Sequence, residues 1–500
     1  MMNLNKTVFS LPALLIGTVC FASAWNPSNA PEKFNVDFHP ATYTKKFTAL
    51  PLAGSVTNEH IPWSDSYWPK NRGGAAYQWK KYSTEDARQD ITPAEAQRMF
   101  LDYRLPSQKE LSQMSQKDLD ELSPTEKFDI FSGKFNYPLT KSYLNRGFFH
   151  KISNKFNRKM SNSKNNAYWE GYCNAWSAAS LHYPEPKPVS RTVTVNGKQI
   201  TLNFGSGDVK ALMVASYAEH LAGNPQMGNF CNQKLTFPGT KMFNGKEVYT
   251  QYADTDGLMM SDYPDYIRNF QASVKRVGYD PSLGLSAADA ADPSLADRLS
   301  GILNSDQNCQ DTNAGAFHVL MANQLGLMKE GFVIDKTMDV EIWNQPVFKY
   351  VSTVVGPAAL SSTKAPQAVS AVEVKTSLFY GDDTDYGWTY WNPTLTNLFG
   401  TDSSFLDEFF SYQRMLIKQG DQDKILSYPN NVIGVSHYTY NLELDAAGNV
   451  VGGEWLSFDR PDIAWLPHKF AFDGKFQDLN RLYEPIQVPA DAVPNFGDEE

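Results

Sequence analysis

The sequence predicts an α+β fold in which a helix that carries a cysteine packs on an antiparallel sheet, behind an irregular and partly helical N-terminal region. Three observations favour this class. Helix signals that begin with proline occur before residue 150, a small-residue helix begins at Cys173, and most strand-like runs lie after residue 340. Strands collected in one part of a chain and helices in another are typical of α+β proteins.

The composition indicates a folded protein of one large or two moderate domains. The chain has 500 residues, of which 42% are hydrophobic and 13% aromatic, and its formal net charge is -10. This hydrophobic content excludes an intrinsically disordered chain. Because binding to nucleic acid needs a basic surface, the acidic balance predicts that nucleic acid is not a partner.

The first 24 residues predict a secretory signal peptide. Lys6 precedes an apolar run over residues 8–21, and Ala22-Ser23-Ala24 fits the small-residue cleavage pattern. An uncleaved anchor is the alternative, although the apolar run is short for a membrane span. We therefore expect a secreted or periplasmic protein with no stable membrane insertion after signal cleavage.

We divide the chain into four regions. Residues 1–24 are the signal peptide, and residues 25–150 form an aromatic and helical region, part of which we consider as a removable pro-segment. Residues 151–470 form the catalytic core, and residues 471–500 form a C-terminal tail.

The N-terminal region contains two helix starts of one kind. Thr92–Glu95 and Ser123–Glu126 each fit a capping box with proline at the first helical position. Gly133 is a natural stop for the second helix. The polar segment over residues 107–121 is either a solvated linker or a surface helix.

The cysteine count predicts one free thiol. Cys20 leaves with the signal peptide, so an exported chain would keep Cys173, Cys231 and Cys309. An odd count indicates a free thiol or an intermolecular bridge. The simplest assignment is a disulfide between Cys231 and Cys309 with Cys173 reduced, since an oxidising compartment permits that pairing.

The Cys173 segment, residues 166–180, places this cysteine at the start of a helix of small residues. Unpaired N–H groups and partial positive charge at a helix N-terminus lower the pKa of a thiol that is accessible, which makes it a candidate nucleophile. The alternative is a buried structural cysteine, the more common fate of this residue.

The elements after Cys173 begin with a predicted β-hairpin over residues 192–204 that turns at Asn196-Gly197. Asp208 is expected to cap a helix over residues 209–221. The acidic segment over residues 254–257 lacks the later ligand of a calcium loop, so we interpret it as a turn.

Strand-like runs dominate the second half. They cover residues 340–354 and 372–379, and a hairpin is predicted over residues 439–455. The acidic segment Asp382–Asp385 between two such runs is a turn by default and a weak candidate for a metal site.

A thiol nucleophile needs a base and a group that orients that base. Among eight histidines, His318 alone has a distinctive context of small and apolar residues, although a core histidine is the alternative. Asp335 follows 17 residues later at the end of an apolar strand, and Asp339 and Asn344 compete with it for the third role. This chain order of cysteine, histidine and acid or amide is that of papain-like and transglutaminase-like enzymes.

The segment Val340–Val347 resembles the signature peptide of the elicitor-type transglutaminases of oomycete plant pathogens, a family with bacterial members. Other blocks in the family's order are similar to it as well. They are Tyr67-Trp-Pro with Gly73–Trp79, Leu122–Phe128, Gly171–Trp176, Asn313–Gly326, and Gly452–Trp455 through Pro461–Trp465.

The resemblance implies a papain-like or transglutaminase-like core and a secreted transglutaminase that responds to calcium or tolerates it. It implies Cys173 as nucleophile and His318 as base, with Asp335 as the third member. Trp343 and Pro346 fall in the segment that the family needs for activity. The nucleophile block departs from the family's pattern at Tyr172-Cys173-Asn174, which can alter substrate choice.

The expected reaction is that of a protein-glutamine γ-glutamyltransferase, which forms isopeptide bonds through a cysteine thioester. The expected partners are proteins that carry reactive glutamine and lysine, or small amines. Trp176, Trp343, Asn344 and Pro346 are the expected substrate-binding residues. A cysteine peptidase or glutamine deamidase on the same triad is the nearest alternative, and a non-enzymatic surface-binding protein is the next.

Overall fold

A computed structural model of the chain describes residues 29–32, 34, 43–57, 60–70, 73–77, 103–146, 170–221, 223–228, 312–336, 342–361, 364–383, 433–457 and 460–485. It also describes residues 271 and 291 and four short strands: β5 (Lys234–Leu235), β6 (Thr240–Phe243), β7 (Lys246–Tyr249) and β8 (Leu258–Met259). Every structural statement below concerns these residues.

Several predictions from the sequence lie outside the described residues. They are the signal peptide over residues 1–24, the helix start at Thr92–Glu95, the disulfide between Cys231 and Cys309, the acidic segment over residues 254–257, and Asp339. Within the described ranges, no helix is long and apolar enough to cross a membrane.

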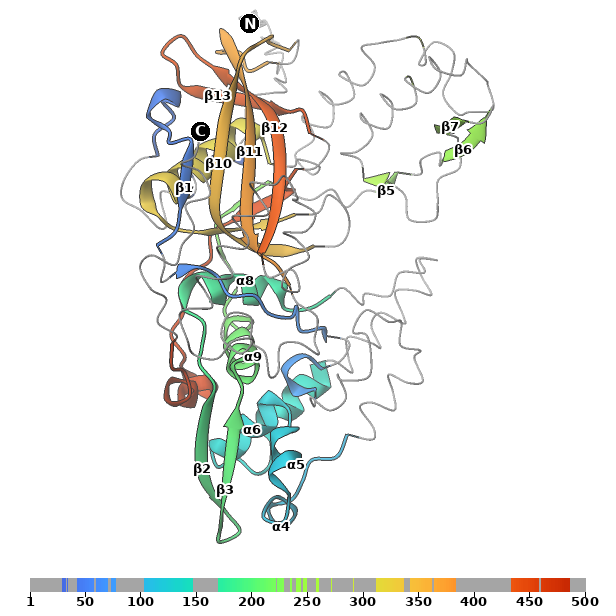
Figure 1. Cartoon of the computed structure of the whole chain (residues 1–500), viewed down its shortest axis with the longest axis vertical. Coiled ribbons are helices and arrows are strands. Elements are labelled where there is room, and N and C mark those ends of the chain that lie inside the picture. Colours follow the sequence, from blue (N-terminus) through green and yellow to red (C-terminus); the bar gives the residue numbers. More distant parts are fainter. Residues whose placement is uncertain are drawn as a thin grey trace, which may run out of the picture.

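The described chain forms an elongated molecule with a sheet in one half and helices with a hairpin in the other (Figure 1). Helix α8 (Cys173–His182) crosses below the ends of the long strands. Helices α6 (Pro124–Phe131) and α9 (Ser206–Tyr217) and strands β2 (Val189–Val195) and β3 (Lys198–Phe204) fill the opposite half.

An antiparallel sheet forms the upper half in Figure 1. Its strands follow the order β13-β12-β11-β10-β9-β14-β4, and β1 also pairs with β10. The bounds are β1 (Ala53–Ser55), β4 (Gln226–Met227), β9 (Phe332–Asp335), β10 (Asn344–Ala358), β11 (Ser370–Gly381), β12 (Ile433–Leu444), β13 (Val450–Trp455) and β14 (Ile463–Trp465).

Helix α13 (Ala314–Met321) packs on this sheet and continues into η9 (Ala322–Met328), a π-helix. Asn313 starts α13 because its side-chain oxygen accepts the backbone N–H groups of Gly315 and Ala316. Other short helices are η2 (Phe47–Ala49), η5 (Gly74–Ala76), α4 (Gln108–Leu111), α5 (Gln116–Asp120) and η10 (Gly474–Arg481).

Two clusters of buried hydrophobic side chains lie on opposite faces of the sheet near β9. The α8 cluster contains Trp176 and Val333, and the α13 cluster contains Phe317, Phe332 and Ile334. Side chains alternate between faces along a strand, so β9 contributes to both clusters. By the same alternation, Asp335 points to the face of Val333, which is the face that α8 covers.

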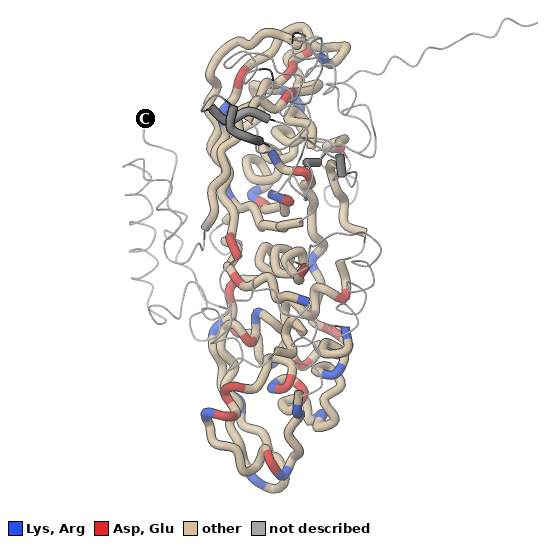
Figure 2. The backbone as a smooth tube through the Cα atoms, turned by 90° about the vertical axis from the view of Figure 1, so that its right-hand side faces the viewer, with Lys and Arg blue, Asp and Glu red and all other residues tan. Residues whose placement is uncertain are grey.

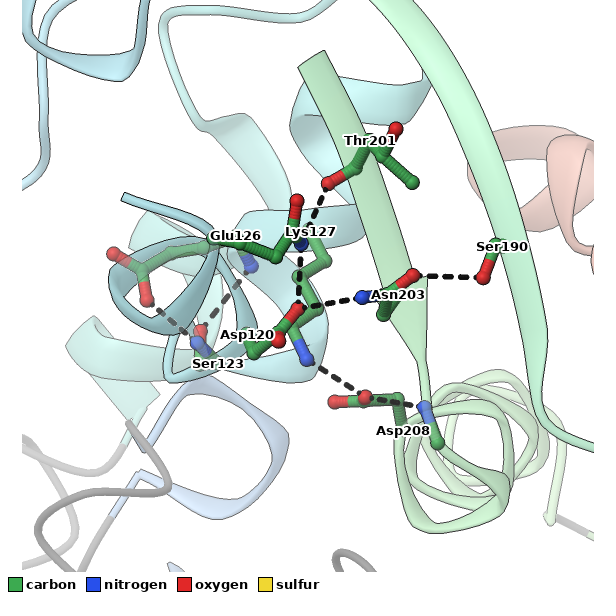
Figure 3. A network of polar contacts seen from close by, with 10 residues as sticks. Asp120, Ser123, Glu126, Lys127, Ser190, Thr201, Asn203 and Asp208 are labelled. Carbon is green, nitrogen blue, oxygen red and sulfur yellow. Dashed lines mark hydrogen bonds and ion pairs between the residues drawn. The ribbon is translucent and has the colours of Figure 1, made fainter. Parts of the chain in front are cut away.

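Buried polar contacts tie α6, α9 and the hairpin together (Figure 3). The Lys127 ammonium of α6 lies 2.8 Å from a carboxylate oxygen of Asp208 in α9, and both side chains are fully buried. Asn203 of β3 donates to Asp120 at 3.0 Å, which joins the hairpin to α5. These contacts join α6 to α9 and the hairpin to α5.

The structure confirms most local predictions. The hairpin over residues 192–204 is present, and Asn196 and Gly197 have φ values of 51° and 77°, the left-handed conformations that a tight turn of this kind needs. Ser123 and Glu126 form the predicted capping box, with Pro124 at the first turn. The hairpin over residues 439–455 is β12–β13.

The start of α9 differs from the prediction. Gly205 occupies the N-cap position, and the helix ends at Tyr217 rather than at residue 221. Asp208 is the third residue of the helix, and its side chain accepts the backbone N–H of Gly205 at 2.8 Å. It therefore makes the N3 contact of a capping box and does not occupy the N-cap position. The polar segment over residues 107–121 is two short helices, α4 and α5.

The α+β prediction is confirmed as a mixed fold of helices and an antiparallel sheet. Acidic and basic residues are interspersed along the described backbone (Figure 2).

Candidate functional site

Cys173 is the first residue of α8, and its thiol is almost buried. The residue is 6% exposed and carries a free thiol. The thiol lies 3.5 Å from the Ile342 carbonyl oxygen, to which it can donate, and the Asn344 side-chain nitrogen lies 3.6 Å from Sγ. The free thiol agrees with the prediction from the cysteine count.

Burial raises the pKa of the Cys173 thiol above its usual value. Hydrogen bonds from Asn344 lower this pKa in part, whereas the negative charges of Asp335 and Asp383 raise it further. A helix N-terminus lowers a thiol pKa only where the thiol is accessible, and here that condition is not met. The resting site therefore holds a neutral thiol at pH 7.

Asn344 presents its amide nitrogen to the thiol because its oxygen is already bound. The Trp465 indole N–H donates to Asn344 Oδ1 at 2.8 Å. With Oδ1 acting as the acceptor on that side, Nδ2 faces Sγ. The network thus fixes which end of the amide meets the cysteine.

Asp335 lies beside Asn344 across the ladder of β9 and β10. The two residues are direct partners in the antiparallel register, and cross-strand partners share a face of the sheet. Asp335 is fully buried, and its Oδ1 accepts the Trp343 backbone N–H at 2.9 Å. Cys173, Asn344 and Asp335 therefore gather at one place.

Helix α8 is anchored to β10 at this place. The Ser177 hydroxyl, one turn after Cys173, lies 2.7 Å from the Cys173 carbonyl oxygen and 2.8 Å from the Asn344 carbonyl oxygen. Because Ser177 is fully buried, this link holds the two elements together where the thiol meets the amide.

An aromatic side chain from the N-terminal region borders the site. The Tyr67 ring lies 5.6 Å from the Trp343 ring, and the Tyr67 carbonyl accepts the Tyr172 N–H at 2.6 Å. A Cβ atom at Gly171 would meet the Tyr67 carbonyl oxygen at 2.1 Å, so only glycine permits this approach. The segment that contains Tyr67 is thus part of the site.

Two of the predicted substrate-binding residues lie in the core. Trp176 is fully buried, and its indole N–H donates to the Trp63 carbonyl at 3.0 Å, which favours its alternative role in core packing. Pro346 is buried in β10 opposite Val333. Trp343, by contrast, is half-buried.

His318 lies apart from Cys173. Its ring is fully buried in α13, and Nδ1 lies 2.8 Å from the Tyr440 hydroxyl, which in turn lies 2.7 Å from Thr376 Oγ1. Burial lowers the pKa of His318 to about 4. Among the described residues, no hydrogen bond joins His318 to the thiol, and its Nε2 atom has no partner.

The reason for this separation is the sheet itself. Residues adjacent to His318, such as Phe317, belong to the α13 cluster, whereas Cys173 belongs to the α8 cluster on the other face. Chain order and a spacing of 17 residues do not specify a face of the sheet. The structure therefore brings together Cys173, Asp335, Trp343 and Asn344, and leaves His318 on the opposite face.

Two site residues were not selected from the sequence as functional. Trp465 orients the Asn344 amide, and Asp383 acts on the thiol through its charge. Trp465 is the last residue of the block Pro461–Trp465, which resembles the family, so this block could have identified it as a site residue. Asp383 had only the acidic segment Asp382–Asp385 as a signal.

Among the described residues, no three His, Cys, Asp or Glu side chains gather as metal ligands. Asp382, the start of the acidic segment, instead lies 3.1 Å from the Lys336 ammonium.

A family match in the second half of the chain supports the resemblance. Residues 296–473 match the family described as transglutaminase elicitor, a range that contains Asp335, Asn344 and Trp465 and begins after Cys173. The crystal structure of the GP42 transglutaminase from Phytophthora sojae is similar to the chain with a TM-score of 0.49 and 19% identity, over 92% of this chain and 97% of that one. No curated protein matches the chain.

Proposed function

We propose that this chain, which residues 296–473 relate to the transglutaminase elicitor family, is a secreted protein-glutamine γ-glutamyltransferase with Cys173 as its nucleophile. The observation that supports it most is the contact of the Cys173 thiol with the Asn344 amide at the start of α8, beside Asp335. The papain-like arrangement of a cysteine helix on an antiparallel sheet is part of this proposal.

In the first step, Cys173 Sγ attacks the side-chain amide carbon of a protein glutamine. The C–S bond forms, the C–N bond breaks, and the thiol proton leaves with the amide nitrogen as ammonia. The product is a thioester on Cys173. Asp335 is the carboxylate on the same face as the thiol, so it carries this proton in the proposal.

In the second step, a lysine or another primary amine attacks the thioester carbon. The C–N bond forms, the C–S bond breaks, and the amine proton returns through Asp335 to the thiolate. The product is an isopeptide bond and the original thiol. No step goes through calcium.

Both steps develop negative charge on the carbonyl oxygen. The backbone N–H of Cys173 at the helix start and the Asn344 amide nitrogen are the donors that this proposal assigns to that oxygen. Because Trp465 fixes the amide orientation, the donor is in place before substrate binds.

The test uses the mature secreted protein with a glutamine-rich protein and a fluorescent primary amine. Incorporation of the amine that Cys173→Ala abolishes supports the proposal. The exposed control Lys475→Gln is expected to leave the rate unchanged. Peptide cleavage, or ammonia release without incorporation, would instead identify a peptidase or a deamidase on the same cysteine.

The burial of the thiol favours a second candidate, a non-enzymatic surface-binding protein. At 6% exposure and with a raised pKa, Cys173 is also compatible with a structural role. Retention of the protein's biological effect in Cys173→Ala, together with no amine incorporation by the unmodified chain, would support this candidate.

A further inference from the structure

A cavity of about 440 Å³ lies at the end of α8 opposite Cys173. Cys173 is the first residue of the ten-residue helix, and the cavity is lined by its last two residues, Leu181 and His182. At a rise of about 1.5 Å per residue, the two ends are about 14 Å apart. The cavity is therefore distinct from the thiol site.

The cavity has an apolar floor and a charged rim. Leu181, Leu466 and Pro467 line it and are buried. Lys329, Lys469 and Glu330 line it and are exposed, so the charged rim carries one more positive than negative charge. An apolar floor with a few polar groups at the mouth is typical of a site for a small organic molecule.

The ionisable side chains that line the cavity are mostly basic, with His60, His182, Lys329 and Lys469 against Glu330. Burial lowers the pKa of His182 to about 3, and the charges of Lys469, His60 and His468 contribute to this shift. Surroundings that disfavour a positive charge on His182 favour a negative charge on a bound molecule. The ligand that fits such a field is an anion.

His182 adds a neutral donor to this environment. The Tyr217 hydroxyl accepts the Phe470 backbone N–H at 3.5 Å and lies 3.0 Å from His182 Nδ1. Burial keeps Tyr217 protonated, so its hydroxyl can donate to Nδ1. The neutral imidazole then carries its hydrogen on Nε2, as a donor.

The backbone at Lys329 is strained. Lys329 ends the π-helix η9 with φ of 61°, a left-handed conformation that glycine or asparagine adopts more readily than lysine. Single-turn π-helices and strained residues cluster at functional sites. A long cationic side chain at this position therefore has a cost to the fold.

We propose that this cavity binds a small organic anion. A phosphate or carboxylate group contacts Lys329, Lys469 and His182 at the rim, and an apolar body lies on Leu181, Leu466 and Pro467. Glu330 adds one negative charge to the rim. An anion therefore binds with its charged group toward the two lysines and away from Glu330. This proposal is independent of the reaction at Cys173.

Isothermal titration of the full mature chain at constant ionic strength tests it with four probes. Phenyl phosphate and benzoate carry the two anionic groups on an apolar body, inorganic phosphate lacks the body, and benzamide lacks the charge. We expect saturable binding at one site by phenyl phosphate, by benzoate or by both, tighter than that of inorganic phosphate, and none by benzamide. The tighter of the two anions identifies the anionic group.

Two substitutions locate the binding. Lys329→Gly removes a charge and also relieves the strained backbone, so this variant is expected to fold at least as well as the original. Lys469→Gln removes the second charge, and Lys475→Gln is a control outside the cavity. Loss of one charge-assisted hydrogen bond should weaken binding about tenfold or more in each of the first two variants.

The proposal fails if neither organic anion binds saturably. It also fails if Lys329→Gly and Lys469→Gln bind the anion as tightly as Lys475→Gln does. Since no probe reacts with the thiol, amine incorporation by Cys173 has no bearing on either outcome.

Discussion

The amide of Asn344 is held at both ends, and this fixes the polar group that faces the nucleophile. Trp465 occupies the oxygen, so the nitrogen meets the Cys173 thiol. A free asparagine can present either end, because its two ends are similar in shape and opposite in hydrogen bonding. In the proposed reaction, Trp465 is thus a positioning residue that acts through Asn344.

Trp465→Phe tests this role. The substitution keeps an aromatic ring and removes the N–H that fixes Asn344, so we expect kcat for amine incorporation to fall about tenfold, with KM little changed. The loss falls on kcat because the amide nitrogen contacts the developing charge. Steady-state kinetics with the fluorescent amine measure both values.

The matched control is Trp455→Phe. The Trp455 indole N–H donates to the Thr312 carbonyl at 2.6 Å on the α13 side of the sheet, so this variant also loses one indole hydrogen bond. We expect it to lower stability and leave kcat unchanged. Equal kinetic losses in both variants would contradict the role of Trp465.

His318 is expected to stabilise the fold and to take no direct part in the reaction. Its partner is Tyr440, and the sheet separates it from the thiol. We expect His318→Gln to retain activity per folded molecule within about twofold. A loss of about a thousandfold with an intact fold would instead identify His318 as the base, with a rearranged chain.

The same residue gives a pH dependence of stability. In the folded chain the pKa of His318 is about 4, below the value of about 6.5 in an unfolded chain. Between these values the unfolded state binds more protons, so stability falls as the pH falls from about 6.5 to about 4, by about 3 kcal/mol in all.

Urea unfolding between pH 7 and pH 4.5 measures this dependence. His318→Gln should reduce proton uptake on unfolding at pH 5 by about one proton. His220→Gln, which removes a half-buried histidine elsewhere, is the control for the loss of a histidine. An unchanged pH dependence in His318→Gln would mean that the imidazole is solvated in the folded chain.

Helices α6 and α9 are joined by a charge pair that water does not reach. Lys127 and Asp208 are fully buried, and Asp208 also caps the start of α9 through Gly205 (Figure 3). A buried pair is costly to desolvate, so each charge depends on the presence of the other. The contact between the helices is therefore sensitive to the loss of either side chain.

Lys127→Met is expected to destabilise the chain by about 3–5 kcal/mol, because it leaves the Asp208 carboxylate buried without its ammonium. Lys127→Met with Asp208→Leu should recover most of this loss, since two apolar side chains need no partner. Urea unfolding of both variants checks this. A double variant less stable than the single one would show that Asp208 acts mainly as a helix cap.

Local features of the elements were predictable from the sequence, whereas their faces were not. The capping box at Ser123 and the turn at Asn196-Gly197 depend on a few adjacent residues, and both are present. Asp335 and Asn344 were selected for their spacing and lie beside Cys173 because β9 and β10 pair there. His318 was selected for its small and apolar neighbours, but which side of a sheet a helix covers depends on contacts distant in sequence.

Strands β9 and β14 contribute side chains to both the α8 cluster and the α13 cluster. In β9, Val333 packs in the α8 cluster and Ile334 in the α13 cluster. Strand β14 does the same, with Trp465 and Ala464 on opposite sides. Because the two faces share a backbone, disruption of one cluster displaces the strands that the other cluster needs.

Val333→Ala and Ile334→Ala should therefore shift one common thermal transition. We expect losses of roughly 2 kcal/mol for the valine and about 2–5 kcal/mol for the isoleucine, from lost burial and the cavity left behind. Differential scanning calorimetry measures the transition. Val369→Ala is the control, since Val369 is 61% exposed and should have no effect.

Two resolved transitions, each sensitive to one of the substitutions, would contradict this expectation. The clusters would then unfold as separate units, and strand β9 would belong to one of them in the folding reaction.

The enclosure of Cys173 has a consequence for oxidative damage. Thiolates, and not neutral thiols, are converted to sulfenic acid and then irreversibly to higher acids, at a rate that follows their exposure. With 6% exposure and a raised pKa, Cys173 reacts slowly with peroxide as well as with any substrate that has not displaced its surroundings. The described sulfhydryl is thus protected from oxidation for as long as the side chains around it stay in place.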